Sequence, residues 1–125
     1  MKAIGQRKVF CGIDIVLISR IEAAARSASF LKKVFTETEL GYSLKKKSPH
    51  KHLAGRFAAK EACLKALTTG FGKGVGWKDI EVVNASDGSP ALKLRSGAKM
   101  HLSGRKAFVS IAYTKDLAVA SVVVE

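Results

Sequence analysis

The spacing of apolar residues changes twice along this chain, and these changes constrain the fold more than any other feature. Residues 9–16 are mostly apolar and β-branched, which predicts a strand buried on both faces. Residues 18–69 carry apolar side chains at helical spacing, and short strand-like runs return from Ile80 onward. One strand, a helical block and then several strands predict a single α+β domain over residues 1–125 and argue against a doubly wound sheet.

The helical block divides into three predicted helices. The first covers residues 18–31, where apolar side chains recur on one face. Thr36 followed by Glu39 has the spacing of a capping box, which predicts a second, short helix running to about Lys46. The dipeptide Ser48-Pro49 marks a break, and the longest helix is expected over residues 50–69.

The last third of the chain is expected to be mostly strand. Ile80 and Val82 alternate with Glu81, and residues 87–90 give a strong turn signal. The remaining predicted elements are a partner strand at 91–95, a short helix at 98–104, and two strands at 108–113 and 117–124.

The charge balance predicts a negatively charged partner. The chain has 22 basic and 10 acidic residues, a net charge of +12 and a pI near 10.0. A nucleic acid, an anionic membrane, a polyanionic metabolite and an acidic protein would each complement such an excess. Aromatic residues make up only 7% of the chain and are not interleaved with basic ones, which argues against a nucleic-acid platform.

The cysteines and the apolar segments predict a cytoplasmic protein. Cys11 and Cys63 cannot form a disulfide framework and suit a reduced compartment. Residues 1–9 lack the apolar core of a signal peptide. The longest apolar stretch, residues 9–18, contains Asp14 and is far shorter than the roughly 20 residues that a membrane span needs.

Asp14 is the first residue whose position needs a chemical explanation. It lies within residues 12–16, a segment otherwise suited to the core. A buried carboxylate requires a hydrogen-bond donor, a positive charge or a metal. The simpler alternative is an aspartate at the end of a strand that caps the following helix, and this segment alone does not separate the two.

The long predicted helix contains a second candidate site. Glu61 and Lys65 are four residues apart and share one stripe, together with Ala54, Ala58 and Ala62. Small alanines let a ligand approach the helix, and a carboxylate beside a lysine suits a hard cation and a phosphate. An ordinary surface ion pair, worth about 0.3 kcal/mol, explains the same spacing.

A glycine-rich segment follows this helix. Residues 70–76 contain four glycines and predict a loop whose backbone amides can hold a phosphate. The segment lacks the Gly-Lys-Ser/Thr ending of a P-loop and follows a helix instead of opening one, so a flexible connector is the commoner explanation. The histidines and cysteines do not have a zinc-site spacing.

Taken in order, these segments resemble the holo-acyl-carrier-protein synthase family of 4′-phosphopantetheinyl transferases. The resemblance is carried by residues 12–22, 35–42, 55–67 and 69–82, and then by Gly88, Pro90, Leu92 and Ser110-Ile111. It covers roughly residues 12–123 and depends on two long motifs at the family's separation. It implies the family's fold, in which an antiparallel-rich sheet packs with a long central helix and shorter helices.

The resemblance also implies an activity. The family moves the phosphopantetheine arm of coenzyme A onto a serine of an acyl carrier protein and leaves adenosine 3′,5′-bisphosphate. By motif position, Asp14 and Glu61 would hold Mg²⁺, and Lys65 would neutralise the phosphates; these three would be the catalytic residues. The proton of the serine hydroxyl would go to Glu61 or to a water molecule.

Further residues are assigned through the same resemblance. Arg56 and Lys60 lie on the part of the helix motif that faces the coenzyme, and Lys65 would contact it as well. Arg20 matches an arginine that docks the acidic carrier protein, and Arg26 is a candidate for the same surface. The family is typically homotrimeric, with sites shared between neighbouring subunits.

One departure from the family pattern affects the coenzyme pocket. After Ser110-Ile111 the family usually has a small hydroxyl residue and a histidine, where this chain has Ala112 and Tyr113. Tyr113 and Thr114 are then the hydroxyls available to a phosphate. The departure leaves a non-catalytic relative that binds the carrier protein or coenzyme A as the main alternative, and a basic nucleic-acid-binding domain as a weaker one.

Overall fold

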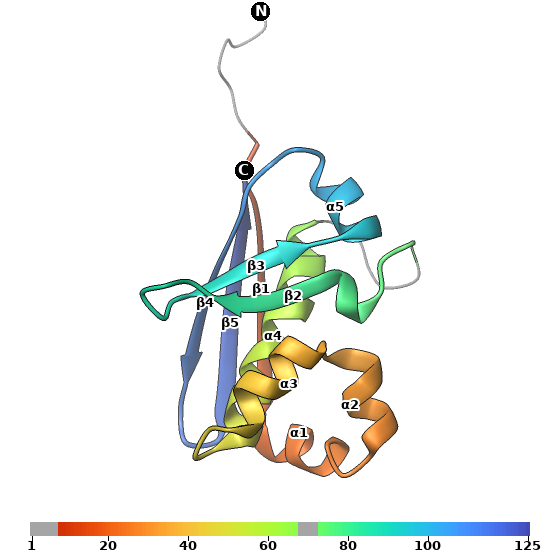
Figure 1. Ribbon diagram of the computed structural model, residues 1–125. Helices are drawn as coiled ribbons and strands as arrows, with labels where there is room; N and C mark the ends of the chain where they lie inside the picture. The colour runs from red at the N-terminus through yellow and green to blue at the C-terminus, as the bar shows by residue number, and fades with distance from the viewer. Residues whose placement is uncertain (1–7, 68–72) are drawn as a thin grey trace, which may run out of the picture.

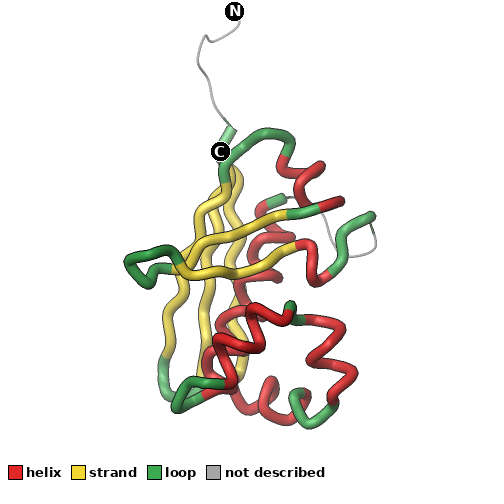
Figure 2. Tube along the Cα trace, viewed as in Figure 1, coloured by secondary structure: helices red, strands yellow, loops and turns green. Residues whose placement is uncertain are grey.

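An antiparallel sheet of three strands forms one layer of the computed structural model, which describes residues 8–67 and 73–125 (Figures 1 and 2). Strand β5 (Leu117–Val124) lies between β1 (Phe10–Leu17) and β4 (Ala107–Tyr113). Strands β2 (Ile80–Asn84) and β3 (Pro90–Leu94) form a separate antiparallel hairpin. The predicted α+β class is confirmed, and the strands fall within one residue of their expected starts.

The helices lie on one side of this sheet, with α4 against it and the shorter helices around both ends (Figure 1). They are α1 (Ile18–Ala24), α2 (Ala28–Val34), α3 (Glu37–Leu44), α4 (Pro49–Ala66) and α5 (Ser96–Leu102), with a 3-10 turn, η1 (Trp77–Asp79). Within the described residues no helix combines the length and apolar character needed to cross a membrane.

Small side chains let α4 pack closely against β1 and β5. Ala58 and Ala62 of α4 and Ala120 of β5 are fully buried. At Gly12 of β1 a Cβ atom would overlap the carbonyl oxygen of Ala62, so the strand backbone lies directly against the helix. This close approach brings the neighbouring Asp14 to the surface of α4.

No element of the described residues covers the opposite face of the sheet, which corrects the prediction that the first strand is buried on both faces. Ile13, Ile15 and Leu17 of β1 are 59%, 60% and 52% exposed, and Phe108 of β4 is 53% exposed. Side chains alternate across a strand, so only one half of β1 faces α4. The apolar composition of a strand predicts that both of its faces are buried. It does not predict which part of the protein buries each face.

The predicted helix boundaries were partly correct. A single helix over residues 18–31 is wrong: α1 ends at Ala24, and Ser27 starts α2 by accepting a hydrogen bond from the backbone nitrogen of Phe30. The capping box of Thr36 and Glu39 is confirmed, with both of its hydrogen bonds formed. The long helix ends before Thr69, and the predicted glycine loop lies partly outside the described residues.

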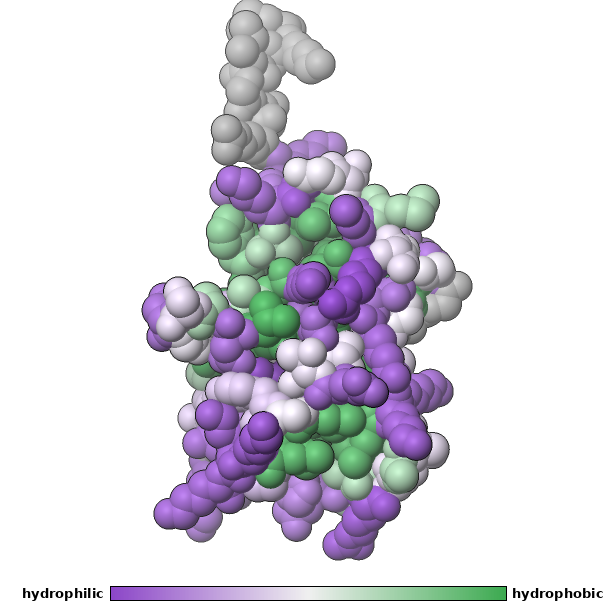
Figure 3. Space-filling model, in the orientation of Figure 1, coloured by the Kyte–Doolittle hydropathy of each residue, from purple (hydrophilic) through white to green (hydrophobic). Residues whose placement is uncertain are grey.

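Hydrophilic side chains surround apolar patches on the face shown in Figure 3. The lower apolar patch in Figure 3 lies over the helices α1, α2 and α3, as Figure 1 shows in the same orientation. Phe30 and Leu31 of α2 and Leu40 of α3 are partly buried against the core.

Candidate active site

Asp14 lies in the middle of β1, on the face that packs toward α4. Its side chain is 19% exposed, and Nζ of Lys65 lies 3.2 Å from its Oδ1 atom. Lys65 also donates a hydrogen bond of 2.9 Å to the carbonyl oxygen of Ile13. The residue before α1 is Leu17, which makes no side-chain cap, so the alternative in which Asp14 caps that helix is wrong. Asp14 is instead a partly buried carboxylate with a lysine partner.

Glu61 brings a second carboxylate to the same place. Partial burial, and then the negative charge of Asp14, raise the pKa of Glu61 above its usual value. The positive charges of Lys65 and Arg20 act in the opposite direction. Among the described residues, the carboxylate that pairs with Lys65 is Asp14. The alternative of an ordinary surface pair between Glu61 and Lys65 therefore gives way to a cluster that spans β1 and α4.

This pair of mutually repelling carboxylates is suited to a cation. No group of three or more His, Cys, Asp or Glu side chains that could hold a metal occurs in the described parts of the chain. The protein would therefore supply two ligands, Asp14 and Glu61. Mg²⁺ commonly binds one or two carboxylates and fills its remaining positions with water and phosphate oxygens. The donor set fits Mg²⁺ together with a phosphate-bearing substrate.

Lys60, the residue before Glu61, does not lie where the resemblance implied. Its side chain is fully buried, with Nζ 2.8 Å from Oε1 of Glu39. It also donates hydrogen bonds to the carbonyl oxygens of Trp77 and Ile80. Burial lowers the pKa of Lys60, and the charge of Glu39 opposes that effect. Lys60 is thus enclosed by protein groups, and the expectation that it contacts a coenzyme is corrected to a structural role.

Two buried glutamates extend this network, and the sequence reasoning missed both. Glu39 accepts a hydrogen bond of 2.8 Å from the backbone nitrogen of Val82, in addition to its capping-box bond. Glu81 accepts hydrogen bonds from Thr36 and from Nη2 of Arg95. The alternation around Glu81 predicted a strand but not the partners of this side chain, and the network holds the β2–β3 hairpin against α3.

Arg56 and Tyr113 line a separate cavity of about 150 Å³. The Arg56 side chain is buried, donates a hydrogen bond of 2.8 Å to Oδ1 of Asn84, and lies 4.1 Å from the centre of the Tyr42 ring. Its Nε has no hydrogen-bond partner in the described residues. The Tyr113 hydroxyl lies against Gly55, where a Cβ atom would overlap it. A buried guanidinium whose Nε lacks a partner among the described residues makes this cavity suited to an anion.

The cavity and the carboxylate cluster lie on different sides of α4. Arg56 and Glu61 are five residues apart, which places them about 140° apart around the helix axis. Asp14 and Tyr113 belong to β1 and β4, the two outer strands of the sheet. Neither Asp14 nor Glu61 lines the cavity that contains Arg56. The structure therefore brings the expected site residues together as two groups and not as one.

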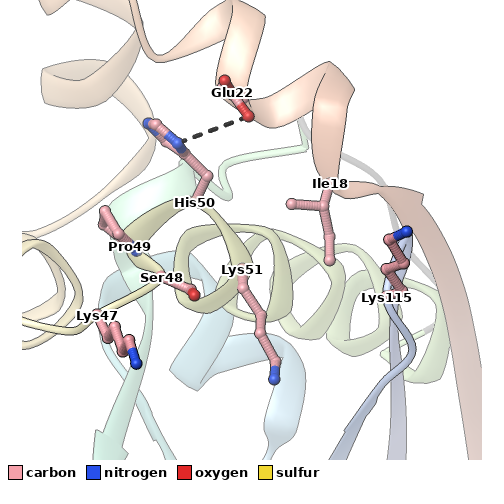
Figure 4. A pocket seen from close by; sticks show the side chains of 8 residues that line it. All are labelled: Ile18, Glu22, Lys47, Ser48, Pro49, His50, Lys51 and Lys115. Carbon is pink, nitrogen blue, oxygen red and sulfur yellow. Dashed lines mark ion pairs between the residues drawn. The ribbon is translucent and has the colours of Figure 1, made fainter.

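A third concavity, of about 350 Å³, lies at the N-terminal end of α4 (Figure 4). Three lysines line it, namely Lys47, Lys51 and Lys115. Nδ1 of His50 lies 3.9 Å from Oε2 of Glu22 and joins α4 to α1 across the cavity. This basic cavity was not found from the sequence, because its lysines come from three separate segments.

The remaining expected residues are placed as follows. Arg20 lies on α1 and Arg26 in the turn after it, and both side chains are exposed, as a docking role requires. Thr114 lies in the β4–β5 turn, where its hydroxyl accepts hydrogen bonds from the backbone nitrogens of Asp116 and Leu117. Those bonds stabilise the turn, so Thr114 has a structural task besides any contact with a phosphate.

Comparison with known proteins gives one consistent result. The holo-[acyl-carrier-protein] synthase of Shewanella putrefaciens is 44% identical over 119 residues, covering 91% of this chain and 94% of the relative. That of Thermodesulfovibrio yellowstonii is 46% identical over 115 residues, covering 90% and 95%.

Solved structures agree with the sequence relatives. A holo-(acyl-carrier-protein) synthase from Bacillus anthracis, crystallised in complex with CoA (3′,5′-ADP), has a TM-score of 0.80 and 38% identity, covering 93% of this chain and 95% of its own. The Helicobacter pylori synthase in complex with coenzyme A has a TM-score of 0.80 and 34% identity, covering 92% and 99%. The family model that describes the 4′-phosphopantetheinyl transferase superfamily matches residues 10–121, and this chain therefore belongs to that superfamily.

Proposed function

We propose that this chain is a holo-[acyl-carrier-protein] synthase, a single transferase domain over residues 1–125. It transfers the 4′-phosphopantetheine arm of coenzyme A to a serine of an apo-acyl carrier protein and releases adenosine 3′,5′-bisphosphate. The observation that carries this proposal is the cluster of Asp14, Glu61 and Lys65, in which β1 and α4 place two carboxylates and one ammonium together. The close relatives named as holo-[acyl-carrier-protein] synthases support the same reaction.

Transfer of a phosphoryl group depends mainly on alignment and charge neutralisation. The serine oxygen of the carrier forms a bond to the phosphorus of the pantetheine phosphate, and the bond from that phosphorus to the leaving adenosine phosphate breaks. The proton of the serine hydroxyl passes to Glu61 or to a water molecule. Asp14 and Glu61 would hold Mg²⁺, which supplies neutralisation of the diphosphate charge when bound. Lys65, whose side chain is half exposed, would leave Asp14 to bind the same phosphates and neutralise part of their charge.

The cavity of Arg56 and Tyr113 is the proposed site for the rest of the coenzyme. Its buried guanidinium, with one nitrogen unpartnered, would bind a phosphate, and the Tyr113 hydroxyl stands where the family usually has a histidine. This cavity and the carboxylate cluster lie on opposite edges of one chain's sheet. A coenzyme that contacts both groups is most simply held between neighbouring subunits.

The uncovered apolar face of the sheet supports such an assembly. It presents Ile13, Ile15, Leu17 and Phe108 to solvent in the isolated chain. Apolar side chains gathered on one sheet face mark an interface. We therefore assign this face to contacts between copies of the chain and propose a homotrimer with shared sites.

The acidic carrier protein is proposed to dock on α1 and its surroundings. Arg20 and Arg26 are exposed there, and the basic cavity of Lys47, Lys51 and Lys115 lies beside the same helix. Complementary fields speed the encounter of oppositely charged proteins. Since this partner accounts for the net charge of +12, no nucleic-acid partner is invoked, and a cytoplasmic location suits both substrates.

One assay tests the reaction directly. Purified protein is incubated with apo-carrier protein, coenzyme A and Mg²⁺, and the carrier's intact mass is followed over time. A mass gain equal to one phosphopantetheine supports the proposal. Unchanged mass with retained binding of the carrier would instead identify a non-catalytic relative, which the Ala112-Tyr113 departure makes the relevant second candidate.

A further inference from the structure

His52 is a titratable residue in the coenzyme cavity that the proposed reaction does not use. Its ring lies between Tyr42 and Tyr113, with centroid distances of 5.8 Å and 5.9 Å. Both contacts are edge-on, with interplanar angles of 87° and 63°. The imidazole therefore lines the same cavity as Arg56 and is held there by two aromatic rings.

The groups that face His52 are mostly cations. Arg56 and Lys51 lie on its own helix. The other segments packed against it contribute Tyr42 from α3, Lys46 from the connection between α3 and α4, and Tyr113 from β4. Lys51 lies 5.0 Å from the centre of the Tyr113 ring, and Lys46 lies 4.4 Å from that of Tyr42. Among the described residues that line this cavity there is no carboxylate.

These surroundings disfavour a positive charge on His52 in the free protein. Burial, and then the charges of Arg56, Lys46 and Lys51, lower the pKa of His52 below its usual value of 6.5. The imidazole is accordingly neutral near pH 7. A phosphate that docks beside Arg56 brings negative charge close to the ring, so the protonated form of His52 becomes favoured over the neutral form.

We propose that His52 is a further binding residue of this cavity and takes up a proton when a phosphate of the coenzyme docks beside Arg56. The inference rests on the proposed function and adds a second cation to the phosphate site. Neutral His52 lets three neighbouring cations coexist in the free protein. Protonated His52 strengthens the site only when the ligand's charge is present.

The sign of the pH dependence follows from this coupling. The ligand raises the proton affinity of His52, so the gain in binding is complete at low pH, where His52 is already protonated in the free protein. This gain in binding is lost as the pH rises through the pKa of His52 in the complex, which is higher than its pKa in the free protein. A difference of one pKa unit between the two states corresponds to about a tenfold change in affinity across this range.

Calorimetric titration with coenzyme A tests the proposal. The heat of binding at pH 7 is measured in two buffers that differ in ionisation enthalpy, which gives the number of protons taken up. The variant His52→Phe keeps a ring between Tyr42 and Tyr113 but cannot titrate. The matched control is His101→Gln, on α5, where the histidine ring contacts the carbonyl oxygen of Lys73 and not this cavity.

At pH 7 the wild type and His101→Gln are expected to take up more protons on binding coenzyme A than His52→Phe does. At pH 6 these two proteins should bind coenzyme A roughly three- to tenfold more tightly than His52→Phe. Taking the difference from His52→Phe removes the titration of the ligand's own phosphate, whose second pKa is about 6. Equal proton uptake by all three proteins, with coenzyme binding retained, would overturn the inference and leave the proposed function intact. Absence of coenzyme binding in the wild type would overturn both.

Discussion

Lys60 and Glu61 are neighbours on α4, and a comparison of their surroundings separates structure from chemistry in this molecule. Lys60 is fully buried, and every partner it needs is supplied by Glu39 and two backbone carbonyls. Glu61 is partly exposed and lies beside Asp14, a group of its own charge. A buried charge whose partners are all supplied by the protein belongs to the folded framework. Two neighbouring carboxylates whose repulsion nearby cations offset only in part indicate a place for a ligand.

The largest expected effect is on activity, at the carboxylate cluster. Asp14→Asn and Glu61→Gln each remove a charge without changing the shape of the side chain. Each is expected to reduce transfer on the order of 10³-fold or more, because the diphosphate loses its neutralising partner. Initial rates from the carrier mass assay, with folding checked by circular dichroism, measure this. Wild-type turnover in either variant would show that the metal assignment is wrong.

A large effect on stability is expected on the other side of the comparison. Lys60→Met leaves Glu39 as an unpaired buried charge and should lower the free energy of unfolding by about 3–5 kcal/mol. Lys65→Met, a matched control five residues further along α4, breaks only a partly exposed pair and should cost about 0–1 kcal/mol. Urea denaturation of both variants makes the comparison.

The double variant Lys60→Met/Glu39→Gln sharpens this result. It removes both members of the buried pair and should recover part of the stability that Lys60→Met loses. Lys65→Met is expected to behave in the opposite way, with near-normal stability and a large loss of transfer. Similar stability losses for the two lysines would contradict the structural assignment of Lys60.

A smaller effect is expected at the carrier surface. Arg20→Ala should weaken recognition of the acidic carrier by roughly three- to tenfold, mainly by slowing association, and the loss should shrink as salt is added. Kinetics of carrier binding at two ionic strengths measure it, with Lys99→Ala on α5 as a charge-matched control. Equal titration of the carrier by Arg20→Ala and the wild type would remove α1 from the docking surface.

The sequence predicted the elements of this fold better than it predicted their environment. The capping box of Thr36 and Glu39 and the limits of β4 and β5 depend on local spacing, which the chain carries within a few residues. The break between α1 and α2 was missed, because the alanines and serines there fit either a helix or a turn.

The same limit applies to the candidate site. The resemblance pointed to Asp14, Glu61 and Lys65, and the structure places these three together. The resemblance did not separate the buried Lys60 from the residues that can reach a ligand. Spacing along a helix tells which residues share a stripe but not what covers that stripe. The burial of Lys60 depends on Glu39 and on the β2–β3 hairpin, which are distant in sequence.

The smallest expected effect lies in the thermal stability of Glu61→Gln. Burial and the charge of Asp14 raise the pKa of Glu61 in the folded protein above its usual value of 4.5. Protonated Glu61 therefore stabilises the fold fully at pH values below 4.5, and this stabilisation is lost as the pH rises through the pKa of the folded state. Near pH 7 and without divalent ions, the variant should therefore melt slightly above the wild type, by about 1–2 °C, and the difference should vanish near pH 4. Addition of Mg²⁺ should raise the Tm of the wild type alone, because binding stabilises only a protein that retains both ligands. Scanning fluorimetry in EDTA and in Mg²⁺ measures both parts, and an equal Mg²⁺ shift in the two proteins would mean that Glu61 is no ligand.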